Sequence, residues 1–183
     1  MSIVSLEQAE CIHRPLSGAL VNIPRRASAV DRKKGSLVLI MKMRQLSVFV
    51  ENRTGRVAEV TRILADHAIN IRVISLADSH DCGIIRLVVN DVDRAIEILR
   101  AHQFTVHDTE VLAVEIPDAP GGMAGVMDIL FHEKINVSYL YGFVERSGEK
   151  AILIFRFEKA DEALRVLQGH GLRVLNGNDL YKL

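Results

Sequence analysis

Two turn glycines, Gly55 and Gly121, each precede a helical pattern and follow a polar side chain that could bind a small ligand. A glycine at such a turn lets the chain bend tightly and exposes backbone N–H groups at the start of the next helix. These donors, at the positive end of the helix dipole, suit a carboxylate. Asn52 adds donors and an acceptor before the first turn, whereas Asp118 adds an acid that would attract an ammonium before the second. The residues therefore predict binding of a small molecule that carries a carboxylate or an amino group.

The same residues also have a structural interpretation. Asn and Asp are common helix caps and turn formers, so Asn52 and Asp118 could simply start their helices. Asn70, which lies between a helical pattern and a strand pattern, could likewise be a turn residue. The residues alone leave both interpretations open.

The two turns belong to an internal repeat. Residues 46–71 read LSVFVENRTGRVAEVTRILADHAINI, and residues 112–137 read LAVEIPDAPGGMAGVMDILFHEKINV. Superposing them places Gly55 on Gly121 and Asn70 on Asn136, and a slightly larger offset aligns the remainder of the two copies. Such a duplication predicts two small domains, which we place at residues 44–110 and 111–183.

Hydrophobic periodicity gives each copy the order β-α-β-β-α-β. In the first copy, alternation over residues 45–51 predicts a strand, and helical spacing from Val57 to about Asp66 predicts a helix. The β-branched runs 71–76 and 83–89 then predict an antiparallel pair.

The turn of this pair is expected at residues 78–81, and a second helix is expected from Asp91. A short strand at 104–106 ends the first copy, and a strand at 111–116 begins the second. The fold class is therefore α+β, with two ferredoxin-like units, each an antiparallel sheet with both helices on one face.

The face of each sheet that the helices leave open carries apolar residues. Residues that alternate with the helix-facing positions are Ser47, Phe49, Glu51, Ile84, Arg86 and Val88, and in the second copy Ile152, Ile154 and Arg156. A face this apolar is expected to be covered by the other copy or by a second chain. Because almost no linker separates the copies, they should pack in one fixed arrangement, edge to edge or face to face.

The N-terminal segment lies outside the repeat. Residues 1–43 show no sustained period, and Met41 and Met43 directly precede the first strand. We interpret the segment as a disordered tail or as the product of a start codon assigned too early.

Composition argues against several classes of function. Lys and Arg number 23, as do Asp and Glu, so the formal net charge is zero and predicts neither a nucleic-acid nor a membrane partner. No apolar run approaches the roughly twenty residues that span a bilayer, and we expect a cytoplasmic protein. Cys11 and Cys82 are too far apart for a zinc motif, so we expect no metal and no cofactor.

Enzyme motifs are also missing. His80, Asp81 and Cys82 form the tightest reactive cluster, but they fall in a predicted turn, and His132-Glu133 lacks the second histidine of a zinc-protease helix. We therefore expect no enzymatic activity and no catalytic residue.

The run FVENRTGRVAEVTRILADHAINI resembles the opening of an ACT domain, a small ferredoxin-like regulatory module of amino-acid metabolism. The resemblance rests on the strand ending at Asn52, the Gly55 turn with its helix, and Asn70-Ile71 entering the next strand. The second copy keeps Asp118, Pro120-Gly121 and Asn136-Val137, so the resemblance covers residues 45–183. It implies that a small ligand, usually an amino acid, binds at an interface between two ACT units.

The resemblance assigns the pocket to the residues that match Asn52, Gly55 and Asn70. With their neighbours and equivalents, the candidate ligand-binding residues are Asn52, Arg53, Thr54, Gly55, Arg56, Asn70, Ile71, Asp118, Pro120, Gly121, Gly122, Asn136 and Val137. Thr54 stands where many ACT loops have proline, so the two pockets need not bind the same ligand.

The sequence thus predicts a non-enzymatic tandem ACT protein that senses an amino-acid effector and forms a homodimer. Two alternatives remain. One is a regulatory subunit of an amino-acid biosynthetic enzyme, similar to the small subunit of acetolactate synthase. The other is a structural dimerisation module whose pockets no longer bind a ligand.

Overall fold

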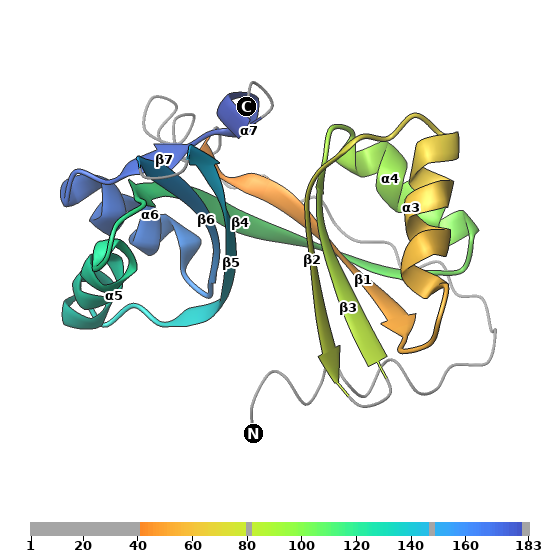
Figure 1. Ribbon diagram of the computed structural model, residues 1–183, viewed down its shortest axis with the longest axis horizontal. Coiled ribbons are helices and arrows are strands. Elements are labelled where there is room, and N and C mark those ends of the chain that lie inside the picture. Colours follow the sequence, from red (N-terminus) through yellow and green to blue (C-terminus); the bar gives the residue numbers. More distant parts are fainter. Residues whose placement is uncertain (1–40, 80–81, 147–148, 181–183) are drawn as a thin grey trace, which may run out of the picture.

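The structure, a computed structural model, describes residues 41–79, 82–146 and 149–180 (Figure 1). Its elements follow one another in this order: β1 (Met43–Glu51), α3 (Arg56–Asp66), β2 (Ile71–Ser79), β3 (Cys82–Val89), α4 (Val92–Ala101), β4 (Thr105–Pro117), α5 (Gly122–His132), β5 (Val137–Arg146), β6 (Lys150–Phe157), α6 (Ala160–Gly169), β7 (Arg173–Leu175) and α7 (Gly177–Leu180).

Two β-α-β-β-α-β units form the molecule, as the repeat predicted. The first unit has the strand order β2-β3-β1-β4 with α3 and α4, and all its neighbouring strands are antiparallel. The second unit has the order β5-β6-β4-β7 with α5 and α6, again antiparallel. The predicted α+β fold with tandem ferredoxin-like units is confirmed.

Strand β4 belongs to both units, and here the sequence prediction was wrong. The expected strands at 104–106 and 111–116 are one continuous strand, because the polar residues between them also pair with β1. Pairing with β1 ends at Val111, and pairing with β6 begins at Leu112. The expected domain division between residues 110 and 111 therefore falls inside a strand.

Side chains alternate along β4 without a break between the units. Val106 faces the core beneath α3 and α4, while Leu112 and Val114 face the core beneath α5 and α6. Val111 and Ala113 point to the opposite side, which we call the inner face. Both helical layers therefore cover the same side of one long, coiled sheet.

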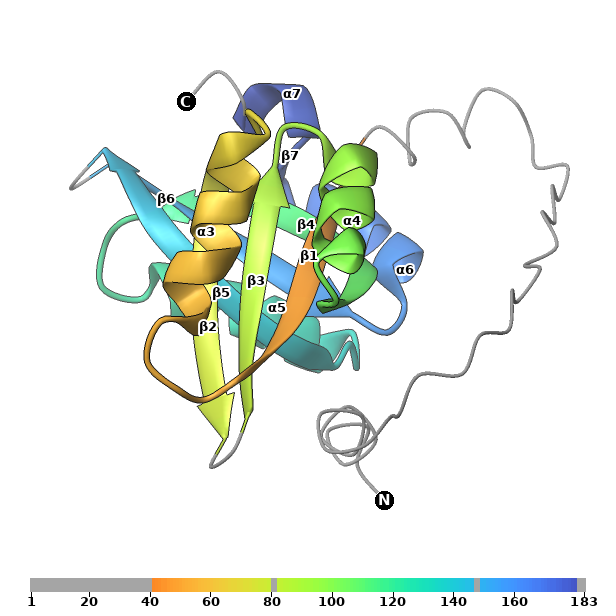
Figure 2. The ribbon, with the colours of Figure 1, turned by 90° about the vertical axis from the view of Figure 1, so that its right-hand side faces the viewer.

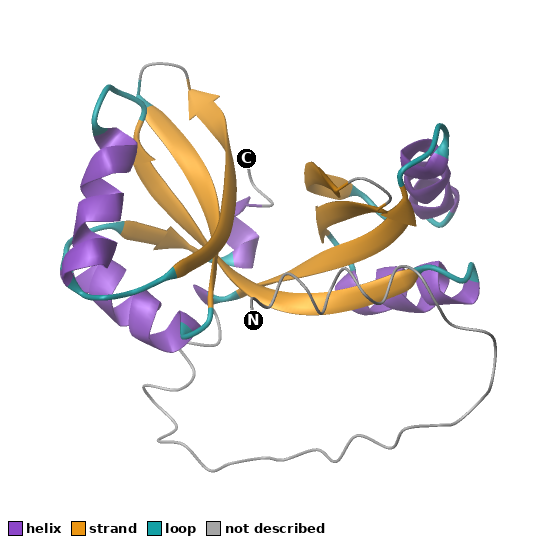
Figure 3. Cartoon of the chain, turned by 90° about the horizontal axis from the view of Figure 1, so that it is seen from below, coloured by secondary structure: helices purple, strands orange, loops and turns teal. Residues whose placement is uncertain are grey.

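The two inner faces turn toward each other. The helices of each unit lie on the outside of the molecule, and the sheets face one another in the middle (Figures 1 and 3). A third apolar cluster fills part of the space between them and combines residues from both units: Met43, Val88, Val111, Ala113, Ile152, Ile154 and Leu175. The expectation that the open faces are covered is thus met within one chain.

Local sequence explains how each outer layer is held. In the first unit α3 and α4 lie side by side over β3 and β1 (Figure 2). The Asp91 side chain caps α4 by accepting a hydrogen bond from the Arg94 N–H at 3.1 Å. Ala95 and Leu99, four residues apart, put the buried stripe of this helix against the sheet.

The structure describes only part of the expected N-terminal tail and of the expected turn at 78–81. Residues 1–40 of the expected tail lie outside the described residues, while Met41 packs against the second core and Met43 begins β1. Strand β2 continues to Ser79 and β3 begins at Cys82, so the hairpin turn is shorter than the expected 78–81. His80 and Asp81 of the reactive cluster lie outside the described residues.

Candidate functional site

The first predicted loop starts α3 from a glycine in the left-handed conformation. Gly55 has φ of 93°, a value that favours glycine, and no side chain caps the helix. Asn52 is therefore not the cap of α3, while the interpretation of Asn52 as a turn residue stays open. Because the first N–H groups of a helix have no partner within the helix, the start of α3 presents donors beside the exposed Asn52 and Thr54.

The two arginines of this loop already have partners. Arg53 makes a charge-assisted hydrogen bond with Glu51, and this bond lowers the pKa of the Glu51 carboxyl. Arg56 pairs with Glu59 at 2.7 Å and lies over the Phe104 ring, with its central carbon 4.8 Å from the ring centroid. A ligand at this loop would meet backbone donors and Asn52, beside two guanidinium groups that already pair with carboxylates.

The second loop repeats this geometry. Gly121 has φ of 89° and starts α5, again without a side-chain cap, so Asp118 is not a helix cap either. Gly122 is required for space, because a Cβ there would lie 2.2 Å from the Pro117 carbonyl oxygen. The Asp118 N–H donates to the Glu149 carbonyl at 3.2 Å, which ties this loop to the hairpin before β6, and Pro120 is exposed.

Asn70 and Ile71 lie at the other end of α3. The helix has eleven residues, so about 16 Å separate its two ends. The Asn70 N–H donates to Asn90 Oδ1 at 2.8 Å, and the Asn90 N–H donates back to the Asn70 carbonyl at 3.1 Å. Asn136 and Val137 occupy the matching position in the second unit, where Val137 is the first residue of β5. Within one unit, the structure does not bring the glycine loop and the asparagine together.

Edge strands provide the surface on which the two halves could meet. Strands β2 and β5 end the strand order, so each has one unpaired edge. Beside these edges, on the helix-facing side, Ile74, Leu76 and Leu140 are 47%, 55% and 37% exposed. Such an edge is a template for pairing with another strand.

A polar network that the sequence analysis missed joins the inner faces. Gln45 is fully buried, and its Nε2 donates to the Tyr139 hydroxyl at 2.8 Å and to Ser47 Oγ at 3.2 Å. The Tyr141 hydroxyl donates to Gln45 Oε1 at 2.8 Å. Burial raises the pKa of Tyr141 well above its usual range. Two signals in the sequence could have indicated this network. Gln45 alternates with the apolar residues of a predicted strand, and Tyr139 and Tyr141 are two residues apart, so they share one face of a strand.

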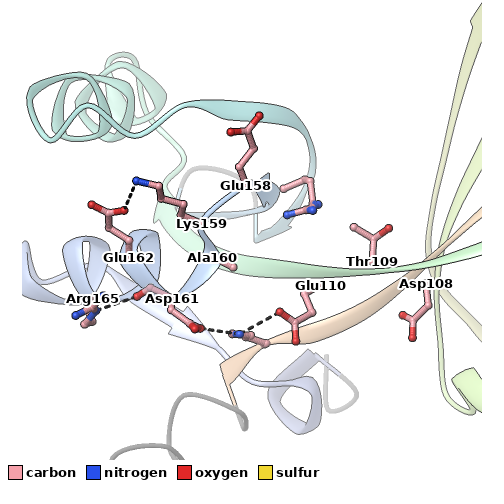
Figure 4. Close-up of a pocket in the computed structure, with 11 residues that line it drawn as sticks. Asp108, Thr109, Glu110, Glu158, Lys159, Ala160, Asp161, Glu162 and Arg165 are labelled. Atoms are coloured by element: carbon pink, nitrogen blue, oxygen red, sulfur yellow. Dashed lines mark hydrogen bonds and ion pairs between the residues drawn. The ribbon is translucent and has the colours of Figure 1, made fainter. Parts of the chain in front are cut away.

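A wider groove of about 520 Å³ lies beside α6 and β4, where the units meet (Figure 4). Lys42 crosses it, pairing with Glu110 at 3.0 Å and with Asp161 at 2.6 Å. Burial disfavours the charged form of Lys42, but the hydrogen bonds that its Nζ donates to Asp161 and Glu110, together with the charges of these acids, raise its pKa. Because these acids are already paired with Lys42, the groove links α6 to β4 and is no ready-made cation site.

Two classes of site find no support in the part of the chain that the structure describes. No group of three His, Cys, Asp or Glu side chains is placed there to hold a metal ion. Within the same residues, no helix combines the length and apolar character needed to cross a membrane.

Comparison with solved structures supports the fold. A protein of Bacteroides thetaiotaomicron is 36% identical with a TM-score of 0.72, and the match covers 78% of this chain and 98% of that one. The regulatory subunits of aspartate kinase from Thermus thermophilus and Thermus flavus are 18% and 17% identical, with TM-scores of 0.50 and 0.51. Those matches cover 69% of this chain and 91% and 90% of the two subunits, and at such identities they show the fold alone.

Comparison at the level of the sequence is consistent with this result. No curated protein matches the chain. The family model described as an ACT domain pair matches residues 41–183, which include both units and the shared strand. The chain therefore belongs to the ACT domain pair family.

Proposed function

We propose that this protein is a non-enzymatic regulator that binds a small amino acid at an interface between two ACT units. The observation that carries the proposal is the pair of helix starts without a side-chain cap. Helix α3 follows Gly55 and α5 follows Gly121, and each glycine has the left-handed conformation at the same position of its unit. Backbone donors at a helix start suit a carboxylate, and a neighbouring Asn52 or Asp118 provides acceptors for the ammonium.

The geometry supports a second copy of the chain as the element that completes the site. Strands β1 and β2 both run antiparallel to β3, so the Gly55 loop and the end of β2 lie at one end of the sheet. Asn70, at the start of β2, lies at the opposite end. Pairing of two β2 edges about a two-fold axis would place the Gly55 loop of one copy beside Asn70 of the other. We therefore propose a homodimer with ligand sites between the copies.

This arrangement would let the ligand act on assembly. A ligand that contacts both copies binds the dimer better than the separate chains, and it shifts the equilibrium by that difference in affinity. Its output would then pass to another molecule through the state of the dimer. In the regulatory-subunit alternative, that molecule is an amino-acid biosynthetic enzyme.

A thermal-shift screen of the twenty amino acids tests the proposal. An amino acid that binds the folded protein at one hundred times its Kd should add about 2.7 kcal/mol to the free energy of unfolding. At least one amino acid should raise the Tm saturably, and its decarboxylated amine should not. If none does, the structural dimerisation module is the better interpretation. Co-purification with an enzyme would favour the regulatory-subunit alternative.

A further inference from the structure

A small cavity lies between the inner faces of the two units, away from the glycine loops. Its volume is about 80 Å³. Residues from five strands line it: Ser47 and Phe49 of β1, Ile84 and Arg86 of β3, Thr109 of β4, Tyr139 of β5 and Arg156 of β6. The lining thus contains two guanidinium groups and three hydroxyls, and no carboxylate is among these seven residues.

Arg86, from the first unit, is incompletely satisfied. Its guanidinium carbon lies 4.1 Å from the centroid of the Tyr139 ring, so the aromatic face covers one side of the cation. Its Nε is buried and has no hydrogen-bond partner among the described residues. Arginine stays charged in proteins, and Arg86 is half-buried, so its partly desolvated charge favours an opposite charge beside it.

Arg156, from the second unit, meets the same cavity from the facing sheet. It lies opposite Tyr139 in the β5–β6 ladder, and within the described residues it forms no salt bridge. Arg156 and Thr109 also line the wider surface groove, so the two hollows adjoin.

We propose that this cavity binds one oxyanion group, a carboxylate or a phosphate, held between Arg86 and Arg156. Guanidinium forks match both groups in geometry and charge, and the hydroxyls of Ser47, Thr109 and Tyr139 can donate to the remaining oxygens. A cavity needs about 10–15 Å³ to hold one water, so this one accommodates a group of a few heavy atoms. The anion would bridge the units and stabilise their face-to-face packing.

The test compares sodium phosphate and sodium acetate with sodium chloride at equal ionic strength. Either anion should raise the Tm of the full chain saturably above the chloride value. Near-ultraviolet circular dichroism should change in parallel, because the chain has no Trp and only three Tyr, and one of these lines the cavity. A response to acetate alone would identify a carboxylate site, and a response to phosphate alone a phosphate site.

Variants separate the cavity from general salt effects. Arg86→Met and Arg156→Met should each weaken the anion by at least about tenfold, the scale of a lost charge-assisted hydrogen bond. Arg94→Met, which removes an exposed arginine of α4, should leave the response unchanged. If Arg86→Met fails to fold, Arg156→Met carries the comparison.

Two results would overturn the proposal. One is a Tm in phosphate and acetate equal to that in chloride. The other is an anion response that persists in the double variant of Arg86 and Arg156. Neither result removes the proposed amino-acid site, because the variants lie outside the glycine loops and that site is tested with amino acids in the thermal-shift screen. The anion proposal and the amino-acid proposal can therefore fail independently of each other.

Discussion

The Tyr141 hydroxyl donates a hydrogen bond to Gln45 Oε1 at 2.8 Å, which joins β5 of the second unit to β1 of the first. Gln45 is fully buried, and its other end donates to Tyr139. Within the described residues, the Gln45 Oε1 accepts from the facing unit, so a different packing of the two sheets would leave this buried oxygen without its donor.

Removing the Tyr141 hydroxyl should destabilise the protein. Tyr141→Phe leaves Gln45 Oε1 buried without this donor, and the expected loss in the free energy of unfolding is about 1–3 kcal/mol. Tyr139→Phe is the matched control, because Gln45 Nε2 keeps Ser47 Oγ as an acceptor, and it should cost less. Urea denaturation of the two variants measures the difference. Equal losses would show that the network is not ordered as described.

Alkaline pH should weaken the folded state through the same tyrosine. Burial, followed by the charge of Tyr139, raises the pKa of Tyr141 in the folded protein, and Arg86 only partly offsets this. Protonated Tyr141 contributes fully to the free energy of unfolding below the pKa of tyrosine in the unfolded state, about 10. As pH rises from there toward the higher pKa of the folded state, only the unfolded state releases the proton, so this contribution is lost. The free energy of unfolding should fall above pH 10 more steeply in the wild type than in Tyr141→Phe. Parallel pH profiles would contradict this assignment.

Asn52→Ala should weaken the amino-acid ligand without weakening the fold. Gly55 rather than Asn52 is the N-cap residue of α3, so the Tm without ligand should change little. Loss of one hydrogen bond to the ligand should reduce affinity by at least about 1 kcal/mol, measured by titration calorimetry. A lowered Tm with unchanged affinity would move Asn52 out of the binding site.

A charge on the β2 edge should disrupt the proposed dimer. Leu76 is 55% exposed beside this edge, and Leu76→Lys would place two like charges near the two-fold axis and oppose edge pairing. Light scattering at micromolar concentration should then show a monomer, against a dimer for the wild type. Phe131→Lys on α5, where the side chain is 78% exposed, is the control and should stay dimeric. The reverse outcome would place the interface on the second unit.

Two glycines of α5 should respond in opposite directions. Gly122→Ala forces a Cβ against the Pro117 carbonyl oxygen and should lower the Tm, because backbone must move to relieve the contact. Gly125→Ala meets nothing within 4 Å, and the higher helix propensity of Ala should stabilise the protein by up to about 1 kcal/mol. Thermal unfolding of both variants checks the loop geometry independently of any ligand.

The repeat and its periodicity were sufficient to predict the units, because each core is built from side chains that alternate or recur locally. Leu46, Val48 and Val50 pack under the helices as their spacing required. The continuity of β4 was not predictable in the same way. Asp108 and Glu110 look like a loop in sequence, but they pair with β1 in the ladder. Their side chains bind Arg44 of β1 and Lys42, which directly precedes that strand.

The candidate site was predicted only in part for a similar reason. A glycine before a helical pattern indicates a left-handed turn locally, and both turns are present. Which strand lies opposite Gln45, and which aromatic ring lies against Arg86, depends on how far the sheet coils after Val111. That angle is set by contacts between residues distant in sequence, so no local pattern of β1 or β3 contains it.

The shared strand leaves the molecule without a hinge. Because β4 continues from one sheet into the other and the inner faces share a buried cluster, unfolding of the intact chain should appear in calorimetry as one cooperative transition rather than two. A distortion of one sheet would be transmitted to the other as a change in the twist of β4, which is hydrogen-bonded in both sheets. A change at the loop of one unit would then reach the other unit as a change in the twist of β4, rather than as domain closure about a hinge.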